Sequence, residues 1–424
     1  MALRDTSLVP KDPAYQAIFA REEQVLAGIR DGLITDPLID LIKADDAFWN
    51  KYSIPEGKSA NLVGGNVCSL LKNSWIPTQA GTDIGTRLHA LDKFIVPNHS
   101  VVAGGAVFSA LFGLPINDVD IFFVGTQPDQ ATAIIRQQIG RNQAARSENS
   151  VSTRFSRRLA NGTIDKSSIV DVQYILRLYR SISEVIHGFD VDCCCMAYDG
   201  NNVWITPRAY YSMQKGYNSL NKERMSPSYE YRMLKYAYRG MPILIPGFDY
   251  YEWKTGAGSM ISKMGARNLR KIIMSESKNN HRGFRYVMAM AQMLNRFPKS
   301  AAWLLGMHNN IISDYVGNYK NGHPFDIEAM MEVLGDRYDQ FSKDAHEFWG
   351  LEIWITGKSD IVSYVMLDGT DVFRIPDDVF EFIQKYYTTY PPQNITYKVV
   401  NPGEQATGSF HKIVLDNTAA WWNN

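Results

Sequence analysis

Two aspartates separated by one residue, Asp118 and Asp120, are the side chains of this sequence best suited to metal-assisted chemistry. They stand in the segment DVDIFFVG, whose alternation and β-forming residues predict a strand. Residues two apart on a strand share one face, so both carboxylates project together while Val119 and Ile121 turn toward the core. Hard divalent cations such as Mg²⁺, or Mn²⁺ in its place, prefer carboxylate ligands. The pair therefore predicts a metal site.

Two glycines, Gly104 and Gly105, precede this strand by one predicted helix and one turn. The apolar run SVVAGG ends in them, and AVFSALFG then predicts a helix that ends at Gly113. Glycine at a strand-to-helix turn lets the backbone approach a ligand closely, and the free N–H groups of the helix start can bind phosphate. Combined with the two carboxylates, this arrangement predicts transfer of a nucleotidyl group from an NTP.

The charge of the chain is balanced. Its 424 residues contain 44 Lys and Arg and 44 Asp and Glu, and 45% of them are hydrophobic, as in an ordinary globular protein. Global charge therefore gives no attraction to a polyanion, and binding to nucleic acid would need a local basic patch. The densest basic stretch lies between residues 134 and 162. It is interpreted either as a site for triphosphate or a polynucleotide backbone, or as a solvated loop. Its arginines are Arg136, Arg141, Arg146, Arg154, Arg157 and Arg158.

The four cysteines predict neither a disulfide framework nor a zinc site. Cys193, Cys194 and Cys195 are adjacent, and no C-x-x-C spacing accompanies them or Cys68. We expect them to be reduced and buried in a strand of a cytoplasmic protein. The N-terminus lacks an apolar leader region, and no uncharged run is long enough to span a bilayer, so no membrane contact is expected.

The pattern of predicted elements indicates an α+β chain with three regions. Residues 1–94 predict a helical N-terminal region, residues 95–215 an α/β domain, and residues 216–424 a mainly helical C-terminal domain. Within the middle region, DVDCCCMAYDG and NNVWITP predict a hairpin. The piece between residues 55 and 85 predicts short helices and loops, and the tail from residue 391 a strand pair or a docking arm.

The stretch GGAVFSALFGLPINDVDI resembles the signature of the DNA polymerase β-like nucleotidyltransferase superfamily. It is nearest in style to the head domain of CCA-adding enzymes and bacterial poly(A) polymerases. It is also similar to nucleotidyltransferase-like proteins of phages and large DNA viruses, in which a later F-D-x-x-x-C segment recurs, here FDVDCC. The matching positions of the main signature are Gly104, Gly105, Val107, Leu111, Gly113, Asp118, Asp120 and Ile121. The resemblance implies a polymerase-β-type nucleotidyltransferase domain between helical flanks, with Mg²⁺ and an NTP.

The resemblance also implies a third metal-binding carboxylate, for which two candidates compete. Asp171 stands in SSIVDVQYILR, which resembles the D-V-A-x-x-R strand of CCA-adding enzymes, with Arg177 near the arginine position. The alternative is Asp190 and Asp192, expected on one face of a strand. Asp171 is favoured because a charge inside an apolar strand is costly unless it is paired or bound to a metal. It would also be the general base.

The match departs from the CCA-adding pattern after the glycines, where Phe108 and Ser109 replace the usual Arg-Asp. Downstream, SYEYRMLKYAYRG resembles the nucleotide-selecting helix of that family and offers Glu230, Arg232, Lys235 and Arg239. The other interpretation of that helix is a core helix with a basic outer stripe. The residues assigned to the nucleotide are Gly104, Gly105, Ser109, Arg177, Arg232 and Lys235.

Two classes of function fit these observations. The first is a template-independent nucleotidyltransferase acting on an RNA 3′ end, a protein, a small molecule or a second nucleotide, the last giving cyclic or short oligonucleotides. The second is a catalytically inactive relative of the same fold that serves as a binding or assembly module. The intact Asp-x-Asp favours the first, and the contested third carboxylate favours the second. Oligomeric state is left open by the sequence.

Overall fold

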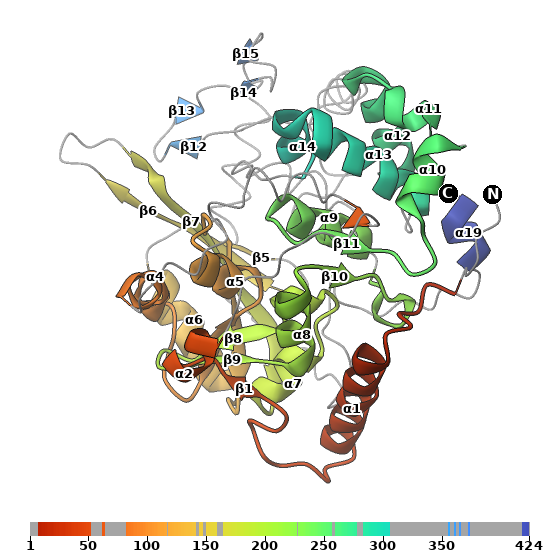
Figure 1. Cartoon of the computed structure of the whole chain (residues 1–424). Coiled ribbons are helices and arrows are strands. Elements are labelled where there is room, and N and C mark those ends of the chain that lie inside the picture. Colours follow the sequence, from red (N-terminus) through yellow and green to blue (C-terminus); the bar gives the residue numbers. More distant parts are fainter. Residues whose placement is uncertain are drawn as a thin grey trace.

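The protein has an α+β fold in which a mixed sheet and its helices lie beside a separate group of helices (Figure 1). The computed structural model describes residues 7–51, 62–63, 82–116, 118–140, 144–146, 150–158, 164–226, 228–256, 259–277, 283–305, 355–356, 360–361, 364–365, 372–373 and 418–423. The predicted α+β class is confirmed.

The main sheet has eight strands in the order β1-β9-β8-β3-β4-β7-β6-β5. Strands β4 and β7 run parallel at its centre, and the other neighbours run antiparallel. The parallel pair aligns the start of β4, at Asp118, with the middle of β7, at Asp171. In chain order the strands are β1 (Ile42–Lys43), β3 (Ser100–Ala103), β4 (Asp118–Val124), β5 (Ala144–Arg146), β6 (Ser150–Arg158), β7 (Ile164–Tyr179), β8 (Met196–Tyr198) and β9 (Val203–Ile205).

Local signals in the sequence set the ends of the helices around this sheet. The side chain of Thr206 accepts a hydrogen bond from the Ala209 N–H and begins α8, and Ser181 begins α7 in the same way. Helix α5 ends where Gly113 adopts a left-handed conformation, with φ of 69°. The helices are α4 (Thr82–Asp92), α5 (Gly105–Phe112), α6 (Pro128–Ile139), α7 (Ile182–His187) and α8 (Pro207–Lys215).

The N-terminal region contributes more than helices. Its strand β1 pairs with β9 at one edge of the main sheet, and β2 (Leu62–Val63) joins β10 (Asn218–Ser219) and β11 (Ile243–Leu244) in a three-stranded sheet. Two helices accompany them, α1 (Pro13–Arg30) and α2 (Asp46–Lys51). Glu22 of α1 is buried and lies 2.8 Å from Arg208 Nε and 3.0 Å from Arg224 Nη2, so α1 is held by charged groups of the middle and following segments. Arg224 belongs to the short 3₁₀ helix η2 (Lys222–Arg224).

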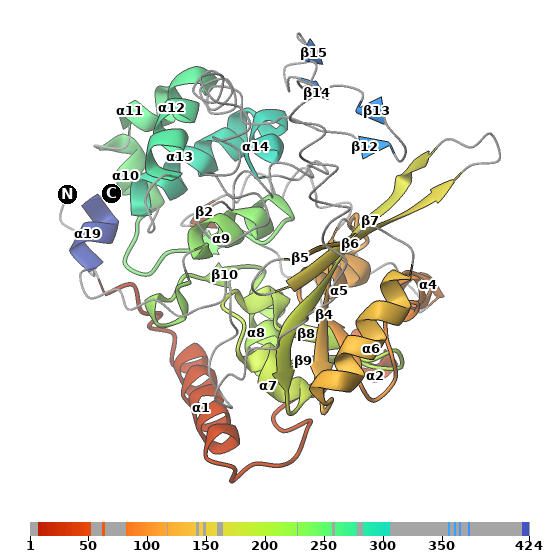
Figure 2. The same ribbon diagram turned by 180° about the vertical axis from the view of Figure 1, so that it is seen from behind.

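The helices after residue 228 gather at the other end of the molecule (Figure 2). They are α9 (Tyr229–Tyr238), α10 (Tyr250–Thr255), α11 (Ser259–Lys263), α12 (Ala266–Ser277), α13 (Gly283–Arg296), α14 (Pro298–Leu304) and the C-terminal α19 (Thr418–Asn423). Of the tail from residue 391, predicted as a strand pair or a docking arm, the described residues 418–423 form a helix, and residues 391–417 lie outside the described residues. Trp421 of α19 is buried, and its indole N–H donates to Glu230 Oε1 of α9 at 2.9 Å.

Two further pairs of short strands complete the described residues, β12 (Ile355–Thr356) with β13 (Asp360–Ile361), and β14 (Tyr364–Val365) with β15 (Val372–Phe373). The helices predicted over residues 327–349 and 378–387 lie outside the described residues. None of the described helices is both long and apolar enough to cross a bilayer.

The prediction of a strand through Asp190–Cys195 is wrong. The chain forms a 3₁₀ turn, η1 (Asp192–Cys194), and β8 starts only at Met196. Two hydrogen bonds with β10 hold this turn. Asn218 Oδ1 accepts from the Cys193 N–H at 2.9 Å, and the Asp192 carboxylate accepts from the Ser219 N–H at 2.8 Å.

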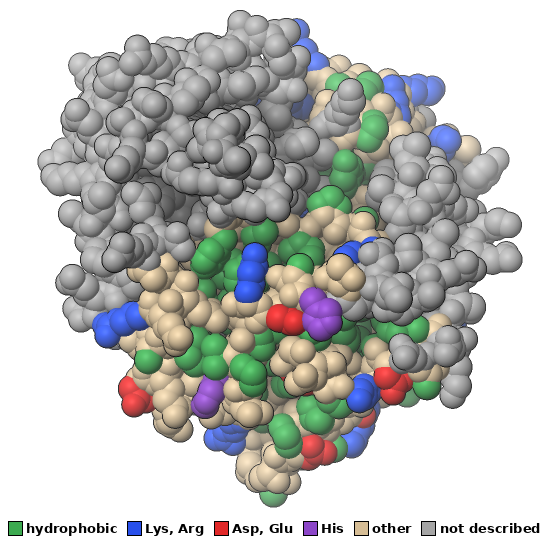
Figure 3. All heavy atoms as spheres, turned by 90° about the vertical axis from the view of Figure 1, so that its left-hand side faces the viewer, with side chains coloured by type: hydrophobic (Ala, Val, Ile, Leu, Met, Phe, Trp, Pro, Cys, Tyr) green, Lys and Arg blue, Asp and Glu red, His purple; other side chains and the backbone are tan. Residues whose placement is uncertain are grey.

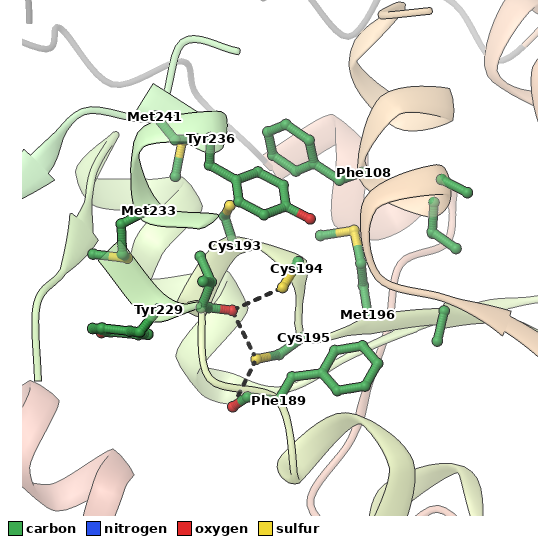
Figure 4. Close-up of a cluster of buried hydrophobic side chains, with 14 of the residues drawn as sticks. Phe108, Phe189, Cys193, Cys194, Cys195, Met196, Tyr229, Met233, Tyr236 and Met241 are labelled. Carbon is green, nitrogen blue, oxygen red and sulfur yellow. Dashed lines mark hydrogen bonds between the residues drawn. The ribbon is translucent and has the colours of Figure 1, made fainter. Parts of the chain in front are cut away.

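The three adjacent cysteines are free and fully buried, as predicted, while Cys68 lies outside the described residues. Figure 4 shows them between α9, which contributes Met233 and Tyr236, and Phe108 of α5. The Cys194 and Cys195 thiols donate to the Val191 carbonyl at 3.1 and 3.2 Å. This cluster packs beneath α9, and the ring of Tyr236 lies 5.5 Å from that of Phe108 of α5.

Candidate active site

The start of strand β4 brings the predicted acidic residues to one edge of the sheet. In the parallel register of β4 and β7, Asp118 lies opposite Asp171 and Asp120 opposite Gln173. On the other side of β4, Asp120 lies opposite Ala103, the residue before the glycine turn. Neighbouring strands lie about 4.8 Å apart. The two aspartates of β4, Asp171 and the glycine turn therefore meet at one place.

The glycine turn is tight and packed on both sides. Gly104 has φ of 80° and ψ of −133°, a conformation that only glycine adopts readily. A Cβ at Gly105 would lie 3.1 Å from the Tyr236 hydroxyl and 3.3 Å from Arg239 Nη1. One contact comes from α9 and the other from Arg239, the residue that follows it, so Gly105 allows this end of α9 to approach the start of α5. The N-terminus of α5 has no side-chain cap, which leaves its first N–H groups for a ligand.

Helix α9 presents basic side chains to the acidic edge. Lys235 Nζ lies 3.2 Å from Asp118 Oδ2, and Arg239 Nη2 lies 3.9 Å from Asp118 Oδ1. Arg239 follows the last residue of α9 and lies four positions after Lys235, so both side chains reach the same side. Arg239 Nη1 also lies 3.5 Å from Ser109 Oγ, so this buried serine supports the arginine.

The two aspartates of β4 differ in their electrostatic environments. The Lys235 ammonium lowers the pKa of Asp118 to about 2. Burial, and then the negative charge of Asp118, raise the pKa of Asp120 to about 7. Asp118 thus forms an ion pair with Lys235, whereas the environment of Asp120 disfavours its charged form. The side chain of Asp118 is 37% exposed and that of Lys235 is 25% exposed, so the ion pair is accessible to solvent.

This donor set fits a hard divalent cation. Two carboxylates share one face, and a third neighbours them in register. Carboxylate oxygens are the ligands such a cation prefers, and water and phosphate oxygens would complete its shell. Within the described ranges, no group of three or more His, Cys, Asp or Glu side chains is placed to hold a metal ion by itself.

Arg177, predicted to contact the nucleotide, lies elsewhere on β7. It is buried, with Nη2 3.8 Å from Glu184 Oε1 and its guanidinium 4.6 Å from the centre of the Tyr179 ring. Its position six residues beyond Asp171 corresponds to roughly 20 Å along a strand. The structure thus does not bring Arg177 to the acidic edge, although it does bring Ser109 and Lys235 there.

The alternative carboxylates, Asp190 and Asp192, are buried in ion pairs rather than aligned on a strand. Asp190 Oδ1 lies 3.0 Å from Arg232 Nη1, and Asp190 Oδ2 accepts from the Ser226 hydroxyl at 2.8 Å. Asp192 Oδ1 lies 2.9 Å from Arg208 Nη1, and burial raises the pKa of Asp192. Arg232, predicted to bind the nucleotide, is therefore engaged with Asp190.

Sequence analysis did not single out Tyr236 and gave Arg239 no assigned role. Tyr236 packs edge-on against Phe108 at 5.5 Å between ring centres and closes over Gly105. The available signal was the spacing of Arg232, Lys235 and Arg239 along one helix. It indicated a basic face, but the pattern alone did not show which of the three would reach Asp118.

With this geometry in place, sequence comparisons relate part of the chain to known proteins. Residues 57–216 match the model of the Gabija anti-defense 2 family, Gad2. The matched segment contains the glycine turn, Asp118, Asp120 and Asp171, and it ends before α9. The chain is also similar to an uncharacterized protein of Acanthamoeba polyphaga mimivirus, with 30% identity over 184 residues. That match spans 39% of this chain and 40% of the viral protein, so the viral protein is matched over less than half of its length.

Solved structures with some likeness to the chain are CCA-adding enzymes. One is that of Thermotoga maritima in complex with tRNA, with 14% identity, a TM-score of 0.30, and coverage of 68% of this chain and 57% of the enzyme. Another is that of Bacillus stearothermophilus with CTP, with 16% identity, a TM-score of 0.28, and coverage of 56% and 53%.

Proposed function

We propose that this chain is a metal-dependent, template-independent nucleotidyltransferase. The observation that carries the proposal is the edge of the sheet where Asp118 and Asp120 share a face, with Asp171 next to them in register and Lys235 of α9 across from them. Carboxylates for cations and basic groups for phosphates thus meet beside an uncapped helix start.

Each residue has a role in this proposal. Asp118 and Asp120 would hold Mg²⁺ or Mn²⁺, with Asp171 as third ligand. A bound divalent cation supplies Lewis-acid stabilisation of charge on the phosphate oxygens. Lys235 and Arg239 would leave Asp118 for the triphosphate, for which their positive charges are suited. The backbone at Gly104 and Gly105 would contact the same phosphates.

The reaction follows from these positions. Asp171 would accept the proton of an acceptor hydroxyl, and the oxygen would form a bond to the α-phosphorus of the NTP. The bond from that phosphorus to the bridging oxygen breaks, and pyrophosphate leaves. The description of the matching family concerns defeat of the Gabija defence, so we further propose that the modified acceptor belongs to such a defence response.

The direct test is transfer of label. The protein would be incubated with Mn²⁺ and each α-³²P-labelled NTP, with and without total RNA and protein extract. We expect label to enter RNA, protein or a short oligonucleotide. Asp118→Asn and Asp120→Asn should abolish it, while Asp129→Asn on the exposed start of α6 should not. Labelling that survives in both site variants would disprove the assignment.

A second candidate is a binding module without catalysis, and one contact favours it. The Lys235 ammonium, 3.2 Å from Asp118, supplies a positive charge where the first proposal places a metal ion. Thermal unfolding with Mn²⁺ and a non-hydrolysable NTP separates the two candidates, because a ligand that binds only the folded state raises the melting temperature. An unchanged melting temperature at saturating nucleotide would select the binding module.

A further inference from the structure

A two-stranded arm leaves the main sheet at the edge that carries the candidate active site. Strand β7 pairs with β4 from Asp171 onward, and among the described strands its first part, Ile164–Val170, pairs with β6 alone. Figures 1 and 2 show this hairpin projecting beyond the body of the protein. We define the arm as residues 154–158 of β6 and 164–170 of β7.

The arm begins at the register position of the acidic residues. Arg154 lies opposite Asp171 in the pairing of β6 with β7, and Asp171 lies opposite Asp118. At about 3.3 Å per residue, Ile164–Val170 extends roughly 20 Å outward from that position. A chain molecule lying along the arm would thus have one end at the candidate active site.

The composition of the arm is basic in a chain that carries no net charge. It contains four basic residues and one acidic residue, Asp165, whereas the whole chain has 44 of each sign. The basic residues are Arg154, Arg157, Arg158 and Lys166. By contrast, the described part of the face seen in Figure 3 shows charged groups of both signs scattered among apolar ones. A local excess of this kind is the electrostatic footprint of phosphate-backbone binding.

Apolar anchoring is the usual basis of a protein interface, and the arm offers little of it. Hot spots of protein interfaces are enriched in tryptophan and tyrosine beside arginine. Phe155 is the one aromatic residue of the arm sequence, and its ring packs on Phe94 with 5.5 Å between ring centres. Serines accompany the arginines instead, and hydroxyl groups commonly donate hydrogen bonds to phosphate oxygens.

We propose that the arm binds the phosphate backbone of a single-stranded nucleic acid and guides its end to the acidic edge. The role of that end as acceptor rests on the proposed nucleotidyl transfer, whereas binding along the arm does not. Contacts to a phosphate backbone are independent of base sequence and weaken with salt, because binding releases counterions.

The test is binding of fluorescent 20-nucleotide single strands, RNA and DNA, to the full chain without NTP or metal. In Arg157→Gln/Arg158→Gln we expect affinity to fall roughly tenfold at 0.1 M salt, and the slope of log K against log salt to drop by about 1.4, or 0.7 for each lost phosphate contact. The matched control is Lys254→Gln/Lys271→Gln, which removes two charges from exposed positions on α10 and α12 and should bind as wild type. Thermal unfolding of both variants checks that they fold.

Two results would overturn the proposal. One is unchanged affinity and salt slope in the arm variant. The other concerns polyglutamate: if it binds the wild type as tightly as the oligonucleotides do, and loses as much affinity in the arm variant, the arm is a site for acidic proteins. Asp120→Asn separates this proposal from the previous one. If Asp120→Asn still binds the oligonucleotides but no longer transfers label, the arm proposal and the proposed function are both supported. If Asp120→Asn still transfers label, that result counts against the active-site assignment alone.

Discussion

The tripeptide Asp-Val-Asp occurs twice in this chain, at residues 118–120 and 190–192, with opposite structural outcomes. In the first, both aspartates lie on one face of β4 in partial contact with solvent, and one has a lysine for a partner. In the second, the chain turns at Val191, and each aspartate is buried against its own arginine. Two aspartates separated by one residue can thus form an accessible candidate site or buried ion pairs that stabilise the fold. The backbone conformation decides which of the two they form.

The largest expected difference between the two copies is in stability. Asp192→Ala would remove one of the two buried carboxylates that pair with Arg208, the other being Glu22, and would leave the Ser219 N–H without its acceptor; such losses cost about 3 kcal/mol. Asp118→Ala removes half of a solvent-accessible ion pair and should cost less than about 1 kcal/mol. Urea unfolding of both variants measures the contrast. Equal losses of unfolding free energy would show that the two copies are not distinct in this way.

The next effect concerns the third carboxylate. Asp171→Asn should lower nucleotidyl transfer by about a hundredfold, the size typical of removing one electrostatic group from a reaction site, with little change in stability. Asp190→Asn should instead lower stability, because Arg232 loses its charged partner in the interior. Transfer rates and urea midpoints of the pair decide between the two candidates. If Asp190→Asn lost transfer and Asp171→Asn lost stability, Asp190 would be the third metal-binding carboxylate.

A smaller effect is expected at the ion pair that distinguishes the first copy. Lys235→Met removes the cation that competes for Asp118, so Mn²⁺ should bind without nucleotide several-fold more tightly, on the scale of about 1 kcal/mol for an accessible pair. The affinity for NTP should fall at the same time, because one positive charge for the triphosphate is lost. Isothermal titration calorimetry measures both. Weaker binding of Mn²⁺ to Lys235→Met would show that Lys235 does not compete with the metal ion for Asp118.

The smallest effect is a pH dependence of the network around the second copy. Burial alone would raise the pKa of Glu22, but Arg208 and Arg224 outweigh it and lower that pKa. A carboxyl whose pKa is lower in the folded state stabilises the fold above its unfolded pKa near 4.5, and that stabilisation is lost as pH falls through the folded pKa. Glu22→Gln should therefore flatten the loss of unfolding free energy below about pH 4.5. An unchanged pH profile would exclude this contribution.

The sequence was sufficient to predict the strand of Asp118 and Asp120 because three local signals agreed: a glycine turn, a helix ended by Gly113, and an alternating strand. Its failure at Asp190–Cys195 has an equally local cause. The β-forming residues there form a 3₁₀ turn instead, in which the Cys193 N–H donates to Asn218 Oδ1 and Asp192 accepts from the Ser219 N–H. Both partners lie some 25 residues further along the chain. Pattern alone cannot reveal such partners.

The basic helix shows the same limit within the site. Its periodicity placed Arg232 and Lys235 on one basic face of the helix. In the structure Arg232 pairs with Asp190, whereas Lys235 pairs with Asp118. Which carboxylate each residue meets depends on the packing of Tyr236 and the cysteines beneath α9. Arg177 likewise has a suitable place in the sequence motif, but the direction of β7 carries it toward Glu184.

The bond from Trp421 to Glu230 has a consequence for how the protein is made. Glu230 lies in the first turn of α9, the helix that carries Lys235 and Arg239, and its indole partner is 191 positions later in the chain. During translation, synthesis must therefore proceed past Trp421 before α9 acquires this contact. A nascent chain stalled before Trp421 would hold Asp118, Asp120 and Asp171 but lack this contact to the helix that carries Lys235.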